Sequence, residues 1–115
     1  MPKMTKHAKK RIKQRTGMSA DIAKRDCRRA YRHGLSHSDT IGDLRGWMDK
    51  KFLCHKSANN MRIYKNHLYI FRYDTLVTMY RIPDNLSKNI EYFIEPCAYQ
   101  IYSDYIASLK QRKTS

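Results

Sequence analysis

The sequence of 115 residues lacks the marks of several common classes of protein. It has only three cysteines, Cys27, Cys54 and Cys97, at wide spacing and without a CxxC pair, which argues against a disulfide framework or a zinc ribbon. Its four glycines form neither a GxGxxG motif nor a P-loop, so no pattern indicates a nucleotide cofactor. We therefore expect the cysteines to be reduced thiols in or near the core.

Long apolar runs are missing as well. No stretch approaches the roughly 18 apolar residues that a membrane-spanning helix needs. The basic N-terminus is not followed by the apolar segment of a signal peptide. We expect a cytoplasmic protein with no membrane partner, and a chain of this length is expected to form one domain over residues 1–115.

Acidic residues are scarce. The chain has 24 Lys and Arg against ten Asp and Glu, which gives a net charge of +14. Twelve of the basic residues, but only Asp21 and Asp26 of the acidic ones, fall within residues 1–32. A field of this sign attracts phosphate backbones or anionic lipid and speeds encounter with them. Because no apolar segment favours lipid, we expect the partner to be a nucleic acid.

Two helices are expected in the basic N-terminal third. The first runs from about Thr5 to Arg15, with Thr5 as its N-cap and Gly17 as a left-handed stop. The second is the segment ADIAKRDCRRAYRH, which has Ser19 as its N-cap and ends at Gly34. Both helices are amphipathic, so each is expected to bury one face.

One carboxylate disturbs the pattern of the second helix. Asp26 projects among the apolar residues, where an unpaired carboxylate would be costly to bury. We therefore predict that Arg11 or Arg15 of the first helix pairs with it. The opposite half of the second helix carries the basic residues that we expect to bind a nucleic-acid backbone: Lys24, Arg25, Arg28, Arg29 and Arg32.

The second half of the chain predicts strands and a final helix. The segments KFLCHK, NMRIYKN, HLYIFRY and TLVTMYRI are rich in aromatic and β-branched residues, which favours a four-stranded antiparallel meander after a weak helix around residues 41–50. Strict alternation would put Leu76, Thr78 and Tyr80 on one face of the last strand. An amphipathic helix is expected over residues 97–112, packed on the sheet or on a partner. The predicted fold class is α+β, with N-terminal helices on a roughly four-stranded antiparallel sheet.

The first helix also carries the candidate catalytic row. His7, Arg11 and Arg15 recur every four residues and lie at the margin of the apolar stripe or inside it, whereas the lysines at 6, 9 and 13 fill the solvated face. RNA cleavage without a metal needs a base, an acid and groups that stabilise a negatively charged phosphorane. Histidine, arginine and hydroxyl side chains supply these functions. The candidate catalytic residues are therefore His7, Arg11, Arg15, Thr78 and Tyr80.

Each of these residues also has a structural interpretation. A histidine on a basic helix is usually solvated, the two arginines can simply neutralise Asp26, and Thr78 and Tyr80 are residues that strands favour. The other histidines match no standard zinc spacing, so neither a metal nor another cofactor is expected. Asn60 and Arg62 at the start of a strand are candidates for contacts with phosphate or base edges, or they form a polar turn.

Five short motifs follow one another along the chain: TKHAKKRIKQRTGMS, HSDTIGDL, ANNMRIY, LYIF and TLVTMYRIP. In these motifs the chain resembles the BECR nuclease superfamily, which groups barnase, EndoU, colicin and RelE-type toxins, and most of all its small bacterial and phage members that open with KHAKKR. The resemblance covers roughly residues 4–84 and leaves the helix over 97–112 as an extension. It implies N-terminal helices on an antiparallel sheet and RNA cleavage without a metal. The family's site residues would fall on His7, Lys10, Arg11, Arg15, Thr78 and Tyr80.

Three functions follow as hypotheses. The first is a toxin-like, metal-independent endoribonuclease that cleaves RNA, with tRNA among the candidate substrates, by attack of the 2′-hydroxyl to give a 2′,3′-cyclic phosphate. The second is a nucleic-acid-binding regulator without catalysis, which would use Lys10 and the basic face of the second helix. The third is a phage or host inhibitor protein that acts through its basic surface. The final helix offers an apolar surface for a neutralising or target protein, or for a homodimer.

Overall fold

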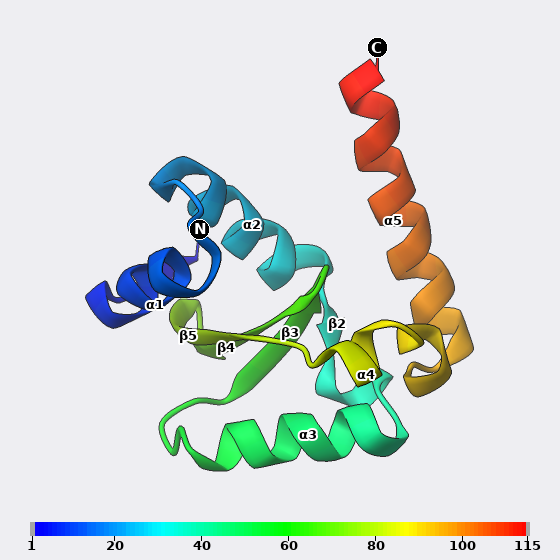
Figure 1. Ribbon diagram of the computed structural model, residues 1–115, viewed down its shortest axis with the longest axis horizontal. Helices are drawn as coiled ribbons and strands as arrows, with labels where there is room; N and C mark the ends of the chain where they lie inside the picture. The colour runs from blue at the N-terminus through cyan, green and yellow to red at the C-terminus, as the bar shows by residue number, and fades with distance from the viewer. Residues whose placement is uncertain (1, 115) are drawn as a thin grey trace.

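A computed structural model describes residues 2–114 of the chain, with side chains placed for residues 2–110 (Figure 1). The described part contains five α-helices, two short 3-10 helices and one five-stranded sheet. In chain order the elements are β1 (Lys3–Met4), α1 (Lys6–Thr16), α2 (Ala20–His33), β2 (Leu35–Ser36), η1 (His37–Asp39), α3 (Gly42–Leu53), β3 (Asn60–Tyr64), β4 (His67–Arg72), β5 (Thr75–Arg81), α4 (Asp84–Ser87), η2 (Ile90–Phe93) and α5 (Pro96–Thr114).

The two N-terminal helices begin and end as the sequence predicts. The Thr5 side chain accepts a hydrogen bond of 3.0 Å from the Ala8 backbone N–H, and α1 stops at Gly17, whose φ of 71° is left-handed. The Ser19 side chain caps α2 by accepting from the backbone N–H of Ile22 at 3.3 Å. These caps fix where each helix begins and ends. They thereby fix which face of the helix each basic residue occupies.

The sheet is mixed rather than purely antiparallel. Its strand order is β1-β5-β4-β3-β2, and β1 pairs with β5 in parallel while the other neighbours are antiparallel. The α+β class is therefore confirmed, but the sheet has five strands where the sequence predicts about four. Three of the predicted strands are present, as β3, β4 and β5. The two strands that the sequence does not predict, β1 and β2, are two residues long, which is too short for a periodic signal.

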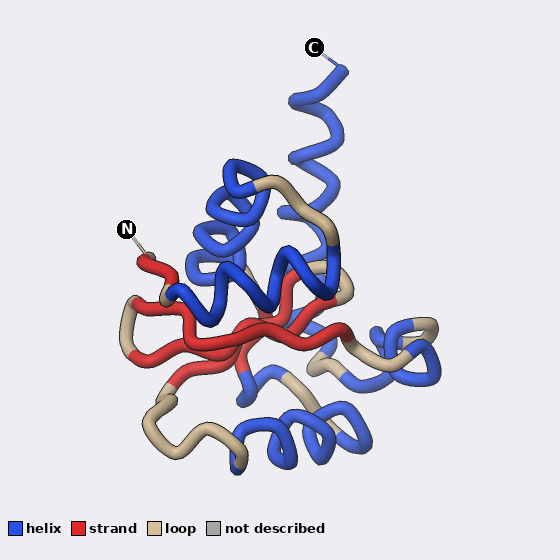
Figure 2. Tube along the Cα trace, turned by 60° about the vertical axis from the view of Figure 1, so that its left-hand side comes forward, coloured by secondary structure: helices blue, strands red, loops and turns tan. Residues whose placement is uncertain are grey.

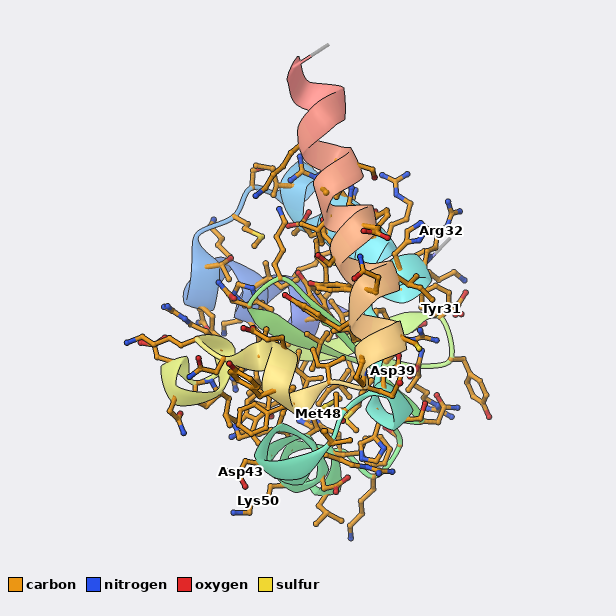
Figure 3. The ribbon with its side chains drawn as sticks, turned by 90° about the vertical axis from the view of Figure 1, so that its right-hand side faces the viewer. Tyr31, Arg32, Asp39, Asp43, Met48 and Lys50 are labelled. Carbon is orange, nitrogen blue, oxygen red and sulfur yellow. The ribbon has the colours of Figure 1, made fainter. Side chains whose placement is uncertain are left out.

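The segment KFLCHK is not a strand. Helix α3 continues to Leu53, and the chain then turns through a loop into β3. Leu44 and Met48 are fully buried and Phe52 packs against the same core cluster, at the four-residue spacing of a helix. Figure 3 shows Met48 pointing toward the sheet and Asp43 and Lys50 on the outer side of α3. The predicted weak helix around residues 41–50 is therefore a full helix, and its last turn replaces the predicted first strand.

The sheet lies between two layers of helices (Figure 2). Helices α1 and α2 cover one face, where Ile12 and Cys27 pack with Phe71 and Met79 of the sheet. Helix α3 covers the other face, which contributes Ile70 and other apolar residues of β3 and β4 to a second core cluster. The protein thus has one core on each face of the sheet. Side chains from either layer of helices can therefore contact residues at the edge of the sheet.

Strand β5 contains an irregularity that changes which residues share a face. Phe71 pairs with Leu76 and Ile70 pairs with Thr78, so Val77 is an extra residue opposite the Ile70–Phe71 step. Leu76 then faces the α1–α2 layer, whereas Thr78 and Tyr80, opposite Ile70 and Leu68, face the α3 layer. The expected common face for Leu76, Thr78 and Tyr80 is therefore wrong.

The final helix packs against the core as far as Leu109 and projects beyond it. In α5 the Tyr102 hydroxyl accepts a hydrogen bond of 2.6 Å from the backbone N–H of Lys65, and the Tyr105 ring stacks on His33 with centroids 4.0 Å apart. Its C-terminal end extends away from the body in both the ribbon view and the tube view (Figures 1 and 2). In the part of the chain that is described, no helix has the length and apolar character needed to cross a bilayer.

The cysteines are free thiols, as expected, but their placement differs from the expectation. Cys27 is buried, and burial raises its pKa to about 12. Cys54 and Cys97 are exposed, so the expectation of core or near-core positions is wrong for these two. Cys54 lies at the end of α3 and Cys97 in the first turn of α5, where helix termini bring them to the surface.

Candidate active site

The second half of β5 forms an open edge of the sheet. Strand β1 pairs only with Thr75 and Leu76, so residues 77–81 have no neighbouring strand on that side. Helix α1, which follows β1 directly, packs along this part of β5. The guanidinium of Arg15 donates a hydrogen bond to the backbone oxygen of Met79, a carbonyl at the open edge. The row of basic residues on α1 is therefore held against the edge of the sheet.

Tyr80 is the point at which three elements meet. The guanidinium carbon of Arg15 from α1 lies 4.6 Å from the centroid of its ring, and the ammonium nitrogen of Lys51 from α3 lies 4.9 Å from the same centroid. From the loop after α3, Nε2 of His55 lies 2.7 Å from the Tyr80 hydroxyl, within hydrogen-bond distance. Two cations therefore lie against the Tyr80 ring, and one imidazole contacts its hydroxyl.

His7 and Arg11 extend the group along α1. The Nε–H of Arg11 donates a hydrogen bond of 3.3 Å to Nε2 of His7, one turn earlier on the helix. Burial lowers the pKa of His55, and the positive charges of His7 and Arg15 lower it further. The charge of His7 therefore acts on His55, although the two side chains belong to different layers of the fold. These surroundings favour the neutral form of the His55 imidazole.

We call this group the edge cluster and define it by its members: His7, Arg11, Arg15, Lys51, His55 and Tyr80. Within residues 2–110, no carboxylate forms an ion pair with any of them. Arginine forks and an ammonium without carboxylate partners are suited to bind phosphate oxygens. Over the same residues, no group of three or more His, Cys, Asp or Glu side chains is arranged to hold a metal ion. The cluster can bind an anion and exchange protons with it.

The structure brings together four of the five candidate catalytic residues. His7, Arg11, Arg15 and Tyr80 belong to the edge cluster. Thr78 does not, because its side chain is only 1% exposed and faces the α3 layer. Its hydroxyl is therefore shielded from a ligand at the edge.

Three residues that the sequence predicts to contact nucleic acid, Lys10, Asn60 and Arg62, lie outside the edge cluster. Lys10 is exposed on α1, but its side chain makes none of the contacts described for the edge cluster. Asn60 and Arg62 lie on β3, two strands away from β5, where Nε of Arg62 donates to the Asn60 side chain at 3.3 Å and a second nitrogen donates to the Gly34 backbone oxygen. These two residues support each other and the end of α2, and nothing described joins them to Tyr80.

The predicted pairing of Asp26 with Arg11 or Arg15 is wrong. Asp26 is 4% exposed and pairs with its neighbour Arg25, whose Nε lies 3.2 Å from its carboxylate. The two arginines of α1 are directed to other partners because α1 lies along β5, so its row faces the sheet edge and not α2. Burial and the charge of Asp26 both raise the pKa of Tyr64, which places the carboxylate over the tyrosines of the sheet.

Sequence reasoning missed two members of the cluster, His55 and Lys51. His55 was considered only as a metal ligand, and Lys51 fell in a predicted strand. Both positions depend on α3 ending at Leu53 and on the loop that returns beneath β5. The buried stripe at residues 44, 48 and 52 was the available signal, because a helix of that length carries its C-terminal turn to the sheet edge.

A second basic feature lies on the other side of α1. A hollow of about 560 Å³ opens between β1, α1 and α2. Its cations form no ion pair among the side chains described for residues 2–110. Because Lys9 is about 160° around α1 from Arg11, the hollow and the edge cluster face opposite directions. Four cations and one carboxylate line it: Lys3, Lys9, Lys24, Arg28 and Asp21.

The edge cluster and the basic hollow are the features that indicate a function. Comparison of the chain with known protein families, with curated proteins and with solved structures gives no match.

Proposed function

We propose that the protein is a metal-independent endoribonuclease and that the edge cluster is its active site. The observation that carries the proposal is the contact of Arg15 and His55 with Tyr80 at the open edge of β5, together with the hydrogen-bonded pair His7 and Arg11 in the same row of α1. Cleavage by the 2′-hydroxyl needs a proton acceptor, a proton donor for the leaving 5′-oxygen and cations that stabilise the phosphorane. The edge cluster contains side chains for each of these functions.

The basic residues of the cluster have distinct roles in this proposal. Arg11 and Arg15 bind the non-bridging oxygens of the scissile phosphate, because a guanidinium matches phosphate with two parallel donors. The Tyr80 hydroxyl adds a further donor at the sheet edge. His7, exposed beside Arg11, exchanges a proton with the bound phosphodiester. Lys51 strengthens the positive field at the ring.

The substrate in this proposal is single-stranded or looped RNA. Attack by the ribose requires a 2′-hydroxyl, so DNA of the same sequence would bind but not be cleaved. The net charge of +14 favours any phosphate backbone, and the resemblance of the sequence motifs to BECR nucleases supports RNA as the substrate and a toxin-like role. Transfer RNA, with its accessible loops, remains the first substrate to test.

The proposal is tested by incubating the purified protein with total tRNA and with a single-stranded RNA in EDTA. We expect the wild-type protein to cleave, and we expect His7→Ala to lower the rate by roughly 10²–10⁴, the usual contribution of one proton-transfer group. Lys6→Ala is the matched control, because Lys6 is an exposed neighbour on the solvated side of α1. Intact RNA with the wild-type protein would contradict the enzyme, and undiminished cleavage by folded His7→Ala would remove His7 from the mechanism.

The basic hollow favours a second candidate function, a nucleic-acid-binding regulator without catalysis. Four unpaired cations around one concave surface form a site for a phosphate backbone whether or not cleavage follows. In this case Lys24 and Arg28 would matter for affinity, and the edge cluster would not. RNA that is bound by the wild-type protein but stays intact in the cleavage assay would favour this function.

A further inference from the structure

RNA cleavage of the proposed kind needs two proton-transfer groups, and α1 supplies only one. The second must lie on the other side of the bound phosphate and must be able to take up a proton near neutral pH. Among the members of the edge cluster, His55 is the remaining imidazole, and it comes from the layer opposite α1.

The position of His55 is fixed from three directions. Its backbone N–H donates to the Phe52 oxygen at 2.9 Å, which continues the last turn of α3. Its backbone oxygen accepts from the Ala58 N–H at 3.0 Å, which closes the following loop. Its ring is then held by the hydrogen bond of 2.7 Å between Nε2 and the Tyr80 hydroxyl. A side chain held in this way needs little reorganisation to receive a proton from a ligand at the edge.

The groups that face His55 are cationic. Arg15 from α1 and Lys51 from α3 both lie on the Tyr80 ring that holds it, and the positive charges of His7 and Arg15 lower its pKa. No carboxylate of residues 2–110 pairs with these side chains. Such surroundings disfavour an imidazolium and keep the neutral ring, which has a free lone pair. They also attract the phosphate whose ribose would supply the proton.

We propose that His55 accepts the proton of the attacking 2′-hydroxyl, that Tyr80 positions its ring, and that His7 protonates the leaving 5′-oxygen; this inference rests on the proposed ribonuclease function. In the tautomer that it requires, the Nε2–H of His55 donates to the Tyr80 oxygen and Nδ1 is the base. The Tyr80 O–H then remains free to donate to a phosphate oxygen.

The step balances without a further reactant. The 2′-oxygen forms a bond to phosphorus and its proton moves to Nδ1 of His55. The bond from phosphorus to the 5′-oxygen breaks, and that oxygen keeps the electron pair and takes the proton of protonated His7. The products are a 2′,3′-cyclic phosphate and a 5′-hydroxyl, and exchange with water restores both histidines. In the structure Arg11 donates a hydrogen bond to Nε2 of His7. This nitrogen can take up a proton once the Arg11 side chain turns to the phosphate.

The first test compares kinetics of His55→Gln with those of a matched control, His37→Gln. His37 is also half-buried and also makes a short side-chain contact, 2.6 Å from Nε2 to Asp49, but lies outside the edge cluster. We expect His55→Gln to lower kcat by roughly 10²–10⁴ with KM nearly unchanged, and His37→Gln to change neither. Added imidazole should restore part of the activity of His55→Ala, which a purely structural role would not allow.

The second test uses pH and Tyr80. The wild-type kcat/KM should fall at acidic pH with a pKa below the usual 6.5 of histidine, and this limb should vanish in His55→Gln. Tyr80→Phe should keep the limb and lower kcat by about tenfold, the worth of one hydrogen bond. Nitrogen NMR of the wild-type protein should find His55 with its proton on Nε2.

These outcomes separate the two proposals. If the wild-type protein cleaves RNA but His55→Gln keeps the wild-type kcat, or if the His55 proton sits on Nδ1, the role of His55 is overturned while the ribonuclease stands. If the wild-type protein does not cleave RNA, the ribonuclease and the role of His55 both fall.

Discussion

At the scale of the residue, the two histidines whose pKa values are lowered link folding to pH. Burial lowers the pKa of His55 and of His67, and neighbouring cations act in the same direction, Arg81 in the case of His67. The unfolded chain therefore binds protons at these positions more strongly than the folded protein does. The contribution of these two histidines to the free energy of unfolding is complete above the unfolded pKa of about 6.5. It is lost as the pH falls toward their pKa values in the folded protein.

We therefore expect the free energy of unfolding to be smaller at about pH 5.5 than at about pH 7.5. Urea unfolding of the wild-type protein and of His67→Gln at the two pH values measures the effect. His67 lies outside the edge cluster, so its replacement tests the linkage without touching the candidate active site. A smaller pH dependence in the variant is the expected result, and an equal or larger one would contradict the assignment.

Single residues also show what the sequence could and could not predict. The caps Thr5 and Ser19 were predictable because capping acts over three residues of one segment. The inward lean of Arg15 was predictable from helical spacing, but its partner was not, since Met79 lies 64 residues away and reaches α1 only through the sheet. For His55 the helical stripe at residues 44, 48 and 52 indicated only where α3 ends, and its contact with Tyr80, 25 residues away, had no signal in the sequence.

At the scale of the element, the junction between α2 and the sheet depends on a glycine. A Cβ at Gly34 would lie 2.5 Å from the Ala30 backbone oxygen and 2.8 Å from that of Ile63, and backbone atoms cannot move aside easily. Gly46, in the middle of α3, would place its Cβ in open space. The two glycines therefore respond oppositely to the same change.

Gly34→Ala is expected to lower the free energy of unfolding by about 1–3 kcal/mol through this clash. Gly46→Ala is expected to raise it by up to about 1 kcal/mol, because alanine favours an exposed helix interior. Urea unfolding or the Tm of the two variants decides the matter, and each serves as the control of the other. Equal stability of the two variants would show that α2 does not approach β3 so closely.

Elements with long periodic patterns were predictable and short ones were not. The spacing of apolar residues indicated α1, α2 and α5, whereas β1 and β2 contain two residues each and form only because the ends of β5 and β3 are available. The irregularity at Val77 shifts the alternation of β5 by one residue, which a strict period of two cannot anticipate.

At the scale of the molecule, the uneven charge should govern RNA binding. The four cations of the basic hollow and the row on α1 lie on opposite sides of one helix, so a strand crossing α1 would contact both. Each phosphate contact releases counterions, and this makes affinity depend on salt.

In a His7→Ala background, which slows turnover in the proposed mechanism enough for binding to be measured, affinity for single-stranded RNA should fall steeply as salt rises. The double variant Lys24→Ala/Arg28→Ala should reduce the slope of log affinity against log salt by about 1–2. Lys88→Ala, an exposed lysine remote from the hollow, is the control with at most a small effect. Fluorescence anisotropy at several salt concentrations measures the slope, and equal slopes for the double variant and the control would exclude the hollow from the RNA path.

The fold class follows from periodicity over many residues, whereas the candidate active site is a product of the whole fold. The row of His7, Arg11 and Arg15 on α1 was predicted from the sequence. The side chains opposite this row come from the end of α3 and the loop after it, and Tyr80 between them comes from β5. Those parts are brought together by long-range packing on both faces of the sheet. This is why sequence analysis found four of the six members of the edge cluster and placed the other two, Lys51 and His55, in a predicted strand.

The most direct test of the proposed ribonuclease activity is the chemistry of the ends that the protein leaves on a defined single-stranded RNA in EDTA. Mass spectrometry of the products from the wild-type protein should find 2′,3′-cyclic phosphate and 5′-hydroxyl ends, and in the same time His7→Ala should yield roughly 10²–10⁴ times less of both. Intact RNA, or fragments that end in a 3′-hydroxyl and a 5′-phosphate, would contradict cleavage by the 2′-hydroxyl at the edge cluster.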